Sequence, residues 1–301
     1  MTLRRYDLNL LTVLDALLRH KNVTRAGKEV GLSQSATSHA LTRLRELFGD
    51  QLLEPSGRQL LLSHRAETIT QPLGRALDLL NSLFDARGFD PATSMRQFNV
   101  GTSDYVAILV LPSFAKDLSA SAPGLVTHFT WAEKDIAKKL RSGQLDLALV
   151  PHGTLADEDL HSHPLFTDDL VVIASADNKE IGNSLDAETY ERMPHARFKR
   201  EQSGGQSYAD LQLQHSGLSV QASILVSNFL LLPFAISGTK CLALLHKRLA
   251  ERFRDTAGIK ILKPPFPTTK LHVHAYWSHA AHSDPAHKWF RTQLFETCNA
   301  L

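Results

Sequence analysis

Two short helical patterns that meet at a glycine, within residues 22–49, constrain the fold more than any other stretch of the chain. The first pattern runs from a Thr24 N-cap to Val30, and the second runs from a Ser33 N-cap to Phe48. Side chains at helical spacing predict a buried face on the second helix, and these are Thr37, Leu41, Leu44 and Phe48. Polar side chains occupy its opposite face, and these are Gln34, Ser35, Ser38, His39, Thr42 and Arg43. The pattern is typical of a helix-turn-helix, whose second helix puts its N-terminal side chains into a DNA major groove.

A helix, a glycine and a second helix also occur in ordinary helical hairpins, so the surrounding sequence decides between the two interpretations. Upstream, residues 7–20 carry an apolar stripe that predicts a preceding helix. Downstream, Leu52-Leu53 and residues 60–62 flank the turn sequence PSGR at 55–58, which predicts two short strands joined by a tight turn. Three helices followed by a β-hairpin with a basic tip form a winged helix-turn-helix, and this arrangement favours DNA binding.

An ordered set of residues in this stretch resembles the N-terminal signature of LysR-type transcriptional regulators. The matching residues are Thr24-Arg25-Ala26, Gly31-Leu32-Ser33-Gln34-Ser35-Ala36, Ser38, Leu41, Leu44, Gly49 and Leu52. Three positions depart from the pattern of the family. Gly27 stands where alanine is usual, Arg45 where glutamate is frequent, and Pro55 where a wing arginine is usual. The departure at Pro55 leaves Arg58 as the expected wing contact.

The winged region is expected to bind double-stranded promoter DNA through hydroxyl, amide and basic side chains. The predicted DNA contacts are Ser33, Gln34, Ser35, Ser38 and Arg43 of the second helix, Arg58 of the wing, and Thr24 and Arg25, which are expected to reach phosphates. Residues 1–65 hold ten basic and six acidic residues, a net charge of +4, whereas the whole chain carries +2. This small basic excess suits a polyanionic partner and supports the motif without replacing it.

Residues 65–84 carry apolar side chains at helical spacing, which predicts a long exposed helix with one apolar stripe. Pro72 is costly inside a helix, so either a kink or a helix start near Thr70 is expected. The stripe is expected to pair with a second copy of the chain, and packing on the chain's own wing is the alternative. The resemblance implies that this linker helix builds a homodimer. Homotetramers and RNA polymerase are further expected partners.

From residue 91 the pattern changes to alternating strands and helices, which predicts two α/β lobes with mostly parallel sheets. Five phrases resemble the effector domain of the LysR-type regulators, which has the fold of periplasmic binding proteins. They are Val100-Gly101-Thr102-Ser103-Asp104, Gly143-Gln144-Leu145-Asp146-Leu147-Ala148, Pro164-Leu165-Phe166, His246-Lys247-Arg248-Leu249-Ala250, and Trp277 with Asp284-Pro285-Ala286-His287-Lys288-Trp289-Phe290. The last phrase is typical of the branch with the nodulation activators and the salicylate-type regulators.

The expected organisation is therefore a winged helix-turn-helix domain at 1–64, a linker helix at 65–90 and an effector domain at 91–301. Within the effector domain, lobe one is expected at about 91–166 and 267–301 and lobe two at about 167–266, by analogy with the family.

A small-molecule effector is expected where strands of the two lobes end, because side chains and helix amides converge there. Thr102, Ser103 and Asp104 follow the first strand, although simple capping of the next helix also explains them. The other candidates are His152, Phe198, Ser203, Asn228 and His246. Aromatic walls with a few neutral donors favour a small aromatic acid or phenol.

Enzymatic and metal chemistry are the rival interpretations. The histidines that suggest a metal are His272, His274, His279, His282 and His287. They divide between a strand, a loop and a helix start, so no metal and no cofactor is expected. The chain contains no GxSxG, HExxH, P-loop or GxGxxG motif, so an enzyme is not expected.

Composition and the ends of the chain bound the remaining possibilities. Hydrophobic residues make up 43% and charged residues 21%, which is typical of a globular protein. Cys241 and Cys298 are expected as buried small hydrophobes. No export signal and no membrane span is evident, so a cytoplasmic protein is expected. The alternative function is a small-molecule-binding or transport-associated protein without specific DNA recognition, which the missing export signal disfavours.

Overall fold

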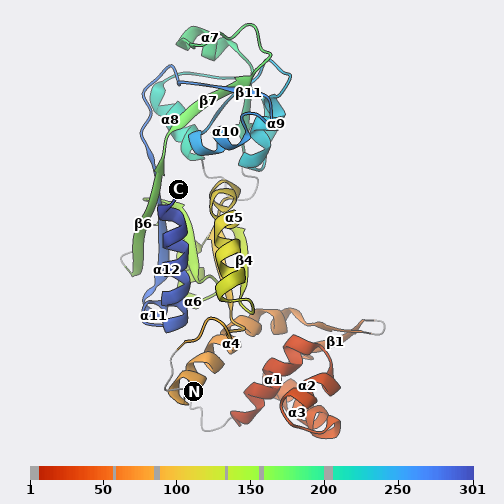
Figure 1. Cartoon of the computed structure of the whole chain (residues 1–301). Helices are drawn as coiled ribbons and strands as arrows, with labels where there is room; N and C mark the ends of the chain where they lie inside the picture. Colours follow the sequence, from red (N-terminus) through yellow and green to blue (C-terminus); the bar gives the residue numbers. More distant parts are fainter. Residues whose placement is uncertain (1–6, 57–58, 85–88, 133–134, 156–158, 200–205) are drawn as a thin grey trace. The chain divides into compact units, whose positions relative to one another are not determined.

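A computed structural model describes residues 7–56, 59–84, 89–132, 135–155, 159–199 and 206–301. The chain forms two compact units, Met1–Asp90 and Pro91–Leu301, which Figure 1 shows coloured along the sequence. The first unit carries a two-stranded sheet and the second carries two five-stranded sheets. Among the described residues, no helix has both the length and the apolar character that crossing a bilayer requires.

The N-terminal unit has three helices, a β-hairpin and a long helix, in the order that the sequence predicts. The elements are α1 (Asn9–His20), α2 (Val23–Glu29), α3 (Gln34–Phe48), β1 (Leu53–Ser56), β2 (Gln59–Leu62) and α4 (His64–Phe84). Strands β1 and β2 pair antiparallel, with Leu53 opposite Leu62. The predicted winged helix-turn-helix is therefore confirmed.

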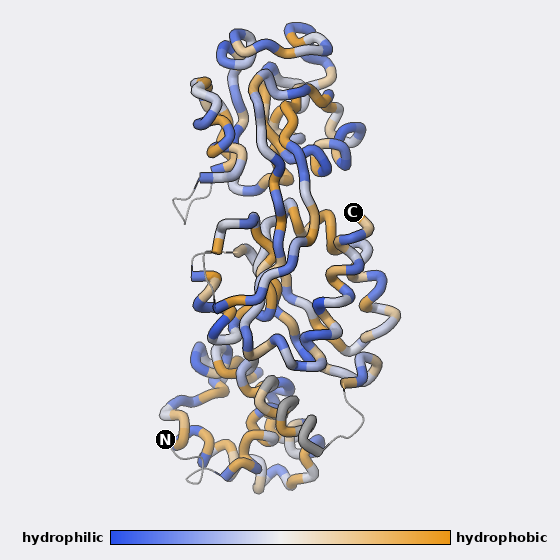
Figure 2. Tube along the Cα trace, turned by 90° about the vertical axis from the view of Figure 1, so that its left-hand side faces the viewer, coloured by the Kyte–Doolittle hydropathy of each residue, from blue (hydrophilic) through white to orange (hydrophobic). Residues whose placement is uncertain are grey.

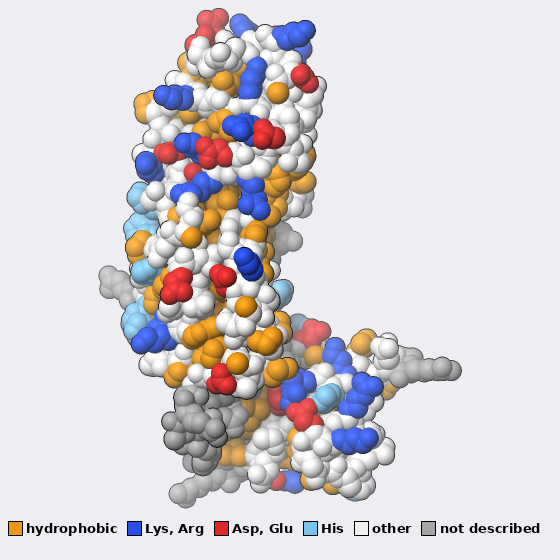
Figure 3. All heavy atoms as spheres, viewed as in Figure 1, with side chains coloured by type: hydrophobic (Ala, Val, Ile, Leu, Met, Phe, Trp, Pro, Cys, Tyr) orange, Lys and Arg blue, Asp and Glu red, His pale blue; other side chains and the backbone are white. Residues whose placement is uncertain are grey.

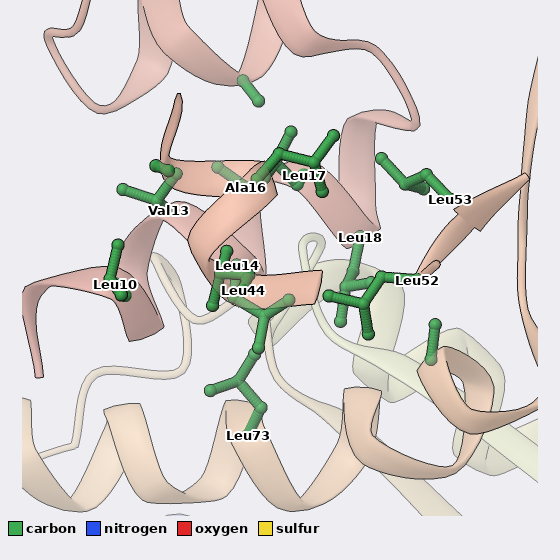
Figure 4. Packing of buried hydrophobic residues seen from close by; sticks show 14 residues of the cluster. Leu10, Val13, Leu14, Ala16, Leu17, Leu18, Leu44, Leu52, Leu53 and Leu73 are labelled. Carbon is green, nitrogen blue, oxygen red and sulfur yellow. The ribbon is translucent and has the colours of Figure 1, made fainter. Parts of the chain in front are cut away.

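One hydrophobic core holds these elements together, and Figure 4 shows its packing. Helix α1 supplies Leu14 and Leu17, α3 supplies Leu44, and the start of the hairpin supplies Leu52 and Leu53, each at most 1% exposed. Burying one such leucine stabilises the fold by about 1.5–3 kcal/mol. The predicted inner face of α3 is confirmed, because Thr37, Leu41 and Leu44 are buried and Phe48 packs against the core. In Figure 2 the N-terminal helices alternate between hydrophobic and hydrophilic residues, as amphipathic helices do.

The turn between α2 and α3 depends on two glycines. Gly31 has a φ of 71°, in the left-handed region that favours glycine. Gly27 lies where α2 approaches the next helix, because a Cβ atom there would stand 2.5 Å from Thr37 Oγ1 and 2.9 Å from the Leu32 carbonyl oxygen. The departure from the usual alanine therefore fits the presence of Thr37 on the facing helix.

Pro72 allowed two expectations, a kink in the helix or a helix start near Thr70. Helix α4 runs from His64 to Phe84 with Pro72 inside, so a helix start near Thr70 is wrong. The Ser63 hydroxyl accepts a hydrogen bond from Ala66 N at 3.1 Å and fixes the earlier start. A proline inside a helix costs about 3 kcal/mol. Burial of Ala66 and Leu73 in the core offsets this cost.

The apolar stripe of α4 is only partly exposed. Leu73 is buried in the core of the winged region, and Ile69 and Leu77 pack against that core. The first part of the stripe thus follows the alternative in which the helix packs on its own wing. Further along, Leu80 is 38% exposed.

The C-terminal unit contains two five-stranded mixed sheets. The first has the order β4-β3-β5-β12-β6 and the second the order β11-β7-β10-β8-β9. The strands are β3 (Gln97–Thr102), β4 (Val126–Trp131), β5 (Leu147–Pro151), β6 (Leu160–Asp168), β7 (Leu170–Ser175), β8 (His195–Phe198), β9 (Ala222–Val226), β10 (Leu242–His246), β11 (Ile259–Leu262) and β12 (Leu271–Ser278). Two α/β lobes are therefore confirmed.

The expectation of mostly parallel sheets is wrong. Strand β3 is parallel to β4 and β5, but β12 is antiparallel to both β5 and β6. In the second sheet β7 is antiparallel to both of its neighbours. The cause is the path of the chain, which leaves the first sheet through β6 and returns to it through β12, so that these strands run in opposite directions.

Helices cover the sheets of both lobes. They are α5 (Asp104–Ser121), α6 (Ile136–Ser142), α7 (Ala187–Arg192), α8 (Tyr208–Ser216), the 3-10 turn η2 (Phe229–Leu231), α9 (Leu232–Ile236), α10 (Lys247–Phe253), α11 (His279–His282) and α12 (Pro285–Asn299). Helices α5 and α12 contact each other, and Phe290 of α12 stacks on Phe98 of β3 with ring centroids 4.1 Å apart. Phe114 of α5 meets Phe290 edge-on at 5.3 Å.

Candidate DNA-binding surface and effector cavity

Helix α3 exposes the row of polar side chains that the sequence predicts for DNA contact. Gln34, Ser35, Ser38 and Arg43 are exposed on the side opposite the buried stripe. Thr24 and Arg25 on α2 are exposed as well. Figure 3 shows Lys and Arg side chains in blue on the visible face of the N-terminal unit.

Two N-caps set where the helices of the motif begin. The Ser33 hydroxyl accepts from Ala36 N at 3.2 Å and so caps α3 as predicted. The Thr24 cap is wrong, because α2 begins at Val23, two residues earlier than that cap implies, and the Asn22 side chain accepts from Arg25 N at 3.0 Å. Both residue types cap helices well, so the sequence favoured neither. Thr24 therefore lies inside the first turn of α2, with its side chain exposed.

The two arginines near the C-terminal half of α3 have different surroundings. Arg43 stays on the exposed face, where its Nη2 donates to Asp7 Oδ2 at 3.1 Å. Arg45 turns toward the wing, where its Nε donates to the Gln51 carbonyl at 2.9 Å and its Nη2 to the Leu53 carbonyl at 3.0 Å. A glutamate could not donate these bonds. Arg45 therefore ties the start of β1 to the recognition helix.

The base of the wing is fixed by an acidic residue that sequence analysis did not single out. Asp50 Oδ1 accepts from Leu52 N at 2.7 Å and from the Ser63 hydroxyl at 2.5 Å. The hydrogen bond from Ser63, followed by that from Leu52 N, lowers the pKa of the Asp50 carboxyl. Leu52 adopts a φ of 59° at this bend. Arg58, the predicted wing contact, lies outside the described residues.

The C-terminal unit contains a cavity of about 350 Å³ lined by residues of both lobes. This volume is within the range of small-molecule pockets, about 300–1,000 Å³. The lining comes from the start of α5, the end of β5, the starts of α6 and β12, and the second lobe. It consists of Ser103, Tyr105, Val106, Ala132, Asp135, Ile136, Leu149, Val150, Pro151, Thr154, Leu155, Phe198, Gln206, Ser207, Tyr208, Phe229, His246, Leu271 and Val273.

A continuous series of aromatic rings joins the lobes in the order Trp131, Phe198, Phe229, His246 and Tyr105, and all of them except Trp131 line the cavity. Phe229 meets His246 edge-on at 5.6 Å, which links the two stacked pairs. Phe198 and Phe229 stack with centroids 4.0 Å apart. Trp131 meets Phe198 edge-on at 6.2 Å. At the other end of the series, His246 stacks on Tyr105 at 4.1 Å. Flat apolar faces of this kind bind aromatic ligands by stacking.

Three predicted effector residues line the cavity. They are Ser103, Phe198 and His246. Ser103 also caps α5, since its hydroxyl accepts from Val106 N at 3.3 Å, so the capping interpretation holds for it too.

The other described candidates lie elsewhere. Thr102 is 2% exposed, and its hydroxyl donates to the Leu149 carbonyl at 2.9 Å within the sheet. Asp104 accepts from Leu230 N at 2.9 Å, which links the start of α5 to η2. His152 is exposed beside His274, with ring centroids 4.3 Å apart. Asn228 is exposed before η2 and makes no capping bond there. Ser203 lies outside the described residues.

The sequence did not single out Tyr105 or Tyr208, which also line the cavity. Tyr105 is 2% exposed, and its hydroxyl donates to Asp168 Oδ2 at 2.5 Å. Asp168 ends β6, where the chain crosses from one lobe to the other. Tyr105 follows the candidate Asp104 directly, but its partner lies 63 residues away, which no local pattern announces.

Burial shifts the pKa of titratable groups in and beside the cavity. His246 is 3% exposed, and burial lowers its pKa to about 3, so its imidazole is neutral near pH 7. Burial also raises the pKa of Asp104 and of Asp168 above the ordinary value of the carboxyl group. Among the described lining residues, none is Lys or Arg. The described walls therefore offer aromatic faces and mostly neutral hydrogen-bonding groups, with the carboxylate of Asp135 as the exception.

The histidines of the first lobe have structural contacts. His287 Nε2 lies 3.0 Å from the Asp146 carbonyl, and His287 Nδ1 lies 3.1 Å from Arg291 Nη1. Burial lowers the pKa of His287 to about 4. His282 Nδ1 accepts from Trp277 Nε1 at 3.2 Å. Figure 3 shows histidines in pale blue along the edge of the C-terminal unit, and within the described chain no three metal-binding side chains are grouped to hold an ion.

Comparison with known proteins agrees with both parts of this architecture. The bacterial regulatory helix-turn-helix domain of the lysR family matches residues 8–67, and the LysR substrate binding domain matches residues 91–299. Nodulation protein D 3 of Mesorhizobium japonicum is 30% identical over 305 residues, which cover 100% of both chains. Nodulation protein D 3 of Rhizobium leguminosarum bv. phaseoli is 31% identical over 307 residues, also covering 100% of both.

A crystal structure with a similar fold is that of the probable transcriptional regulator PA0477 from Pseudomonas aeruginosa. It is 32% identical to this chain, with a TM-score of 0.74 over 97% of each. The members of the matched family are transcription regulators and not enzymes. The chain therefore belongs to the LysR family of DNA-binding transcriptional regulators, with an N-terminal helix-turn-helix and a C-terminal effector-binding domain.

Proposed function

We propose that this regulator binds promoter DNA as a homo-oligomer and that a small aromatic molecule in the cavity controls it. The observation that carries the proposal is the series of aromatic rings that belongs to both lobes and that, apart from Trp131, lines a cavity of about 350 Å³. A ligand that stacks on these rings touches both lobes at once, so it binds the closed arrangement better than the open one. Differential affinity of this kind is what an effector requires.

The proposed division of the chain is a DNA-binding domain at 1–64, a linker helix at 65–90 and an effector domain at 91–301. Within the effector domain, lobe one is about 91–166 and 267–301 and lobe two about 167–266. The proposed DNA contacts are Thr24, Arg25, Ser33, Gln34, Ser35, Ser38, Arg43 and Arg58. The exposure of the described members of this set, and the polar row on α3, support the assignment. Ser33 would act mainly by fixing the start of α3.

The proposed effector is a neutral phenol in preference to a carboxylic acid. Its contacts would be Phe198 and Phe229 as stacking faces, and Ser103 and His246 as hydrogen-bonding groups. A neutral imidazole gives a phenol hydroxyl a partner, whereas it offers a buried carboxylate no compensating charge. Asp104 and Tyr105 would act as positioning residues, because each bonds to a group that belongs to the other lobe or to the crossover.

Pairing of two chains through the exposed end of α4 would build the dimer, since Leu80 is exposed at that end. Pairing of dimers into tetramers and contact with RNA polymerase complete the proposal. Promoter binding also assigns the protein to the cytoplasm.

Calorimetric titration of the full chain with 4-ethylphenol and with benzoate tests the effector proposal. We expect binding of 4-ethylphenol, and its loss in Phe198→Ala, because truncation removes a stacking face. Leu225→Ala is the matched control, since Leu225 is 55% exposed and absent from the cavity lining. Tighter binding of benzoate than of 4-ethylphenol would contradict the preference for a neutral ligand. Equal binding by wild type and Phe198→Ala would contradict the location.

A further inference from the structure

Arg43 lies on the exposed face of the recognition helix and is already paired within the N-terminal unit. Its Nη2 donates to Asp7 Oδ2 at 3.1 Å. The side chains of Arg43 and Asp7 are 59% and 35% exposed. Both partners are thus accessible from solvent, and the pair lies on the face that is to meet DNA.

Asp7 is held in place independently of Arg43. Its Oδ1 accepts from Asn9 N at 3.1 Å, and its carbonyl accepts from Leu10 N at 3.1 Å, so it ends the chain segment that leads into α1. Leu10 is 7% exposed and belongs to the core of the unit. The carboxylate therefore cannot follow the arginine when Arg43 moves to another acceptor.

Phosphate and carboxylate are alternative acceptors for the same guanidinium group, which binds both through charge-assisted hydrogen bonds. Exposed ion pairs are weak, about 0–1 kcal/mol, so a DNA phosphate can displace the Asp7 carboxylate. The Asp7 carboxylate then has lost its partner and lies close to a second anion, the DNA phosphate, and this repulsion costs binding free energy. This cost does not depend on the base sequence, because phosphate contacts carry no sequence information.

We propose that Asp7 competes with DNA phosphates for Arg43 and thereby weakens the affinity of the protein for DNA of every sequence. The proposal requires that Arg43 meets DNA, as the docking of α3 implies. Its consequence is that base contacts contribute a larger share of the affinity, because the phosphate term is reduced.

Substitution Asp7→Asn tests the competition. Asparagine keeps a side-chain oxygen that can accept from Asn9 N, but it carries no charge. The probes are the duplex that the wild-type protein selects from a random 30-bp library and a scrambled duplex of the same composition. We expect binding to both duplexes to tighten by the same factor, roughly 2- to 5-fold, since that is the range of an exposed ion pair.

Arg43→Gln separates competition from general electrostatics. This variant should bind DNA more weakly, and the slope of log affinity against log salt should fall by about 0.9, the value for one phosphate contact. Asp7→Asn should then have no further effect in the Arg43→Gln background. The matched control is Asp15→Asn, which removes the same charge from a residue that bonds Arg19 at 2.7 Å instead of the recognition helix. It should leave affinity unchanged.

Unchanged or weaker DNA binding by Asp7→Asn would overturn the proposal, and so would an equal gain in the Arg43→Gln background. Wild-type affinity of Arg43→Gln would show instead that Arg43 does not reach DNA, while loss of all binding by wild type would refute the regulator itself. If Asp7→Asn melts earlier than wild type, Asp7→Ser repeats the test with a hydroxyl acceptor in place of the carboxylate.

Discussion

Adding one methyl group at Gly27 should loosen the whole winged region. In Gly27→Ala the new Cβ would lie 2.5 Å from Thr37 Oγ1 and 2.9 Å from the Leu32 carbonyl oxygen. Thr37 is fully buried and its hydroxyl donates to the Ser33 carbonyl at 2.9 Å, so it cannot turn away without losing that bond. The Leu32 oxygen is backbone and moves only if the turn moves. Both neighbours therefore resist relaxation.

The magnitude follows from two opposing terms. Overpacking of a tight interior costs about 1–3 kcal/mol, and two contacts below 3.0 Å belong in the upper half of that range. Replacing glycine by alanine inside a helix returns about 0.8–1.0 kcal/mol. The expected net loss is about 1–2 kcal/mol, which lowers the melting temperature of a unit of this size by about 4–16 °C.

Differential scanning calorimetry of the full chain would measure this loss in the transition of the N-terminal unit. Gly74→Ala is the matched control, because Gly74 lies in α4 with no atom within 4 Å of its added Cβ. That control should melt slightly above wild type, by helix propensity alone. A Gly27→Ala protein that melts at or above the wild-type temperature would refute the close approach of α2 and α3.

Three further results are expected. Ser38→Glu places a carboxylate on the exposed face of α3, so a gel shift should show at least about tenfold weaker retention of the selected duplex; full retention would speak against docking by this face. Affinity for any duplex should fall steeply between 50 and 200 mM salt, and a flat dependence would argue against phosphate contacts. Burial lowers the pKa of His246 to about 3 and of His287 to about 4, so the unfolded chain takes up these protons first as the pH falls below about 6.5. The melting temperature of the C-terminal unit should therefore drop from pH 7 to pH 5, and less so in His246→Phe; a rise on acidification would contradict this.

Local patterns were sufficient for the order of elements in the N-terminal unit and for the buried face of α3. The inner face of α3 follows from the spacing of Thr37, Leu41 and Leu44, because residues one helical turn apart share a face. The cap of α2 could not be assigned in the same way, since Asn22 and Thr24 lie two residues apart and have similar capping ability. The earlier start of α4 depends on Ser63 and on burial of Leu73, which are tertiary effects.

In the C-terminal unit the sequence was less informative where partners are distant. Strand β6 was not predicted, because it contains Pro164, which strands accept at an edge or near a bulge. The structure has both conditions, since β6 is an edge strand and the register with β12 shifts next to His274, the partner of Pro164. For Thr102 the sequence suggested a functional contact that the structure does not show. Its position after a strand suggested a ligand contact, but its hydroxyl is used by the Leu149 carbonyl across the sheet.

The central claim is that the N-terminal face of α3 meets DNA, and photo-cross-linking tests it most directly. Ser35→Cys carries an azidophenacyl group on the exposed face of α3, and Ser119→Cys carries the same group at an exposed position of α5. The native Cys241 and Cys298 are buried and should not react. The account predicts cross-links to the selected duplex from position 35 and none from position 119. DNA cross-linked from position 119, with none from position 35, would contradict it.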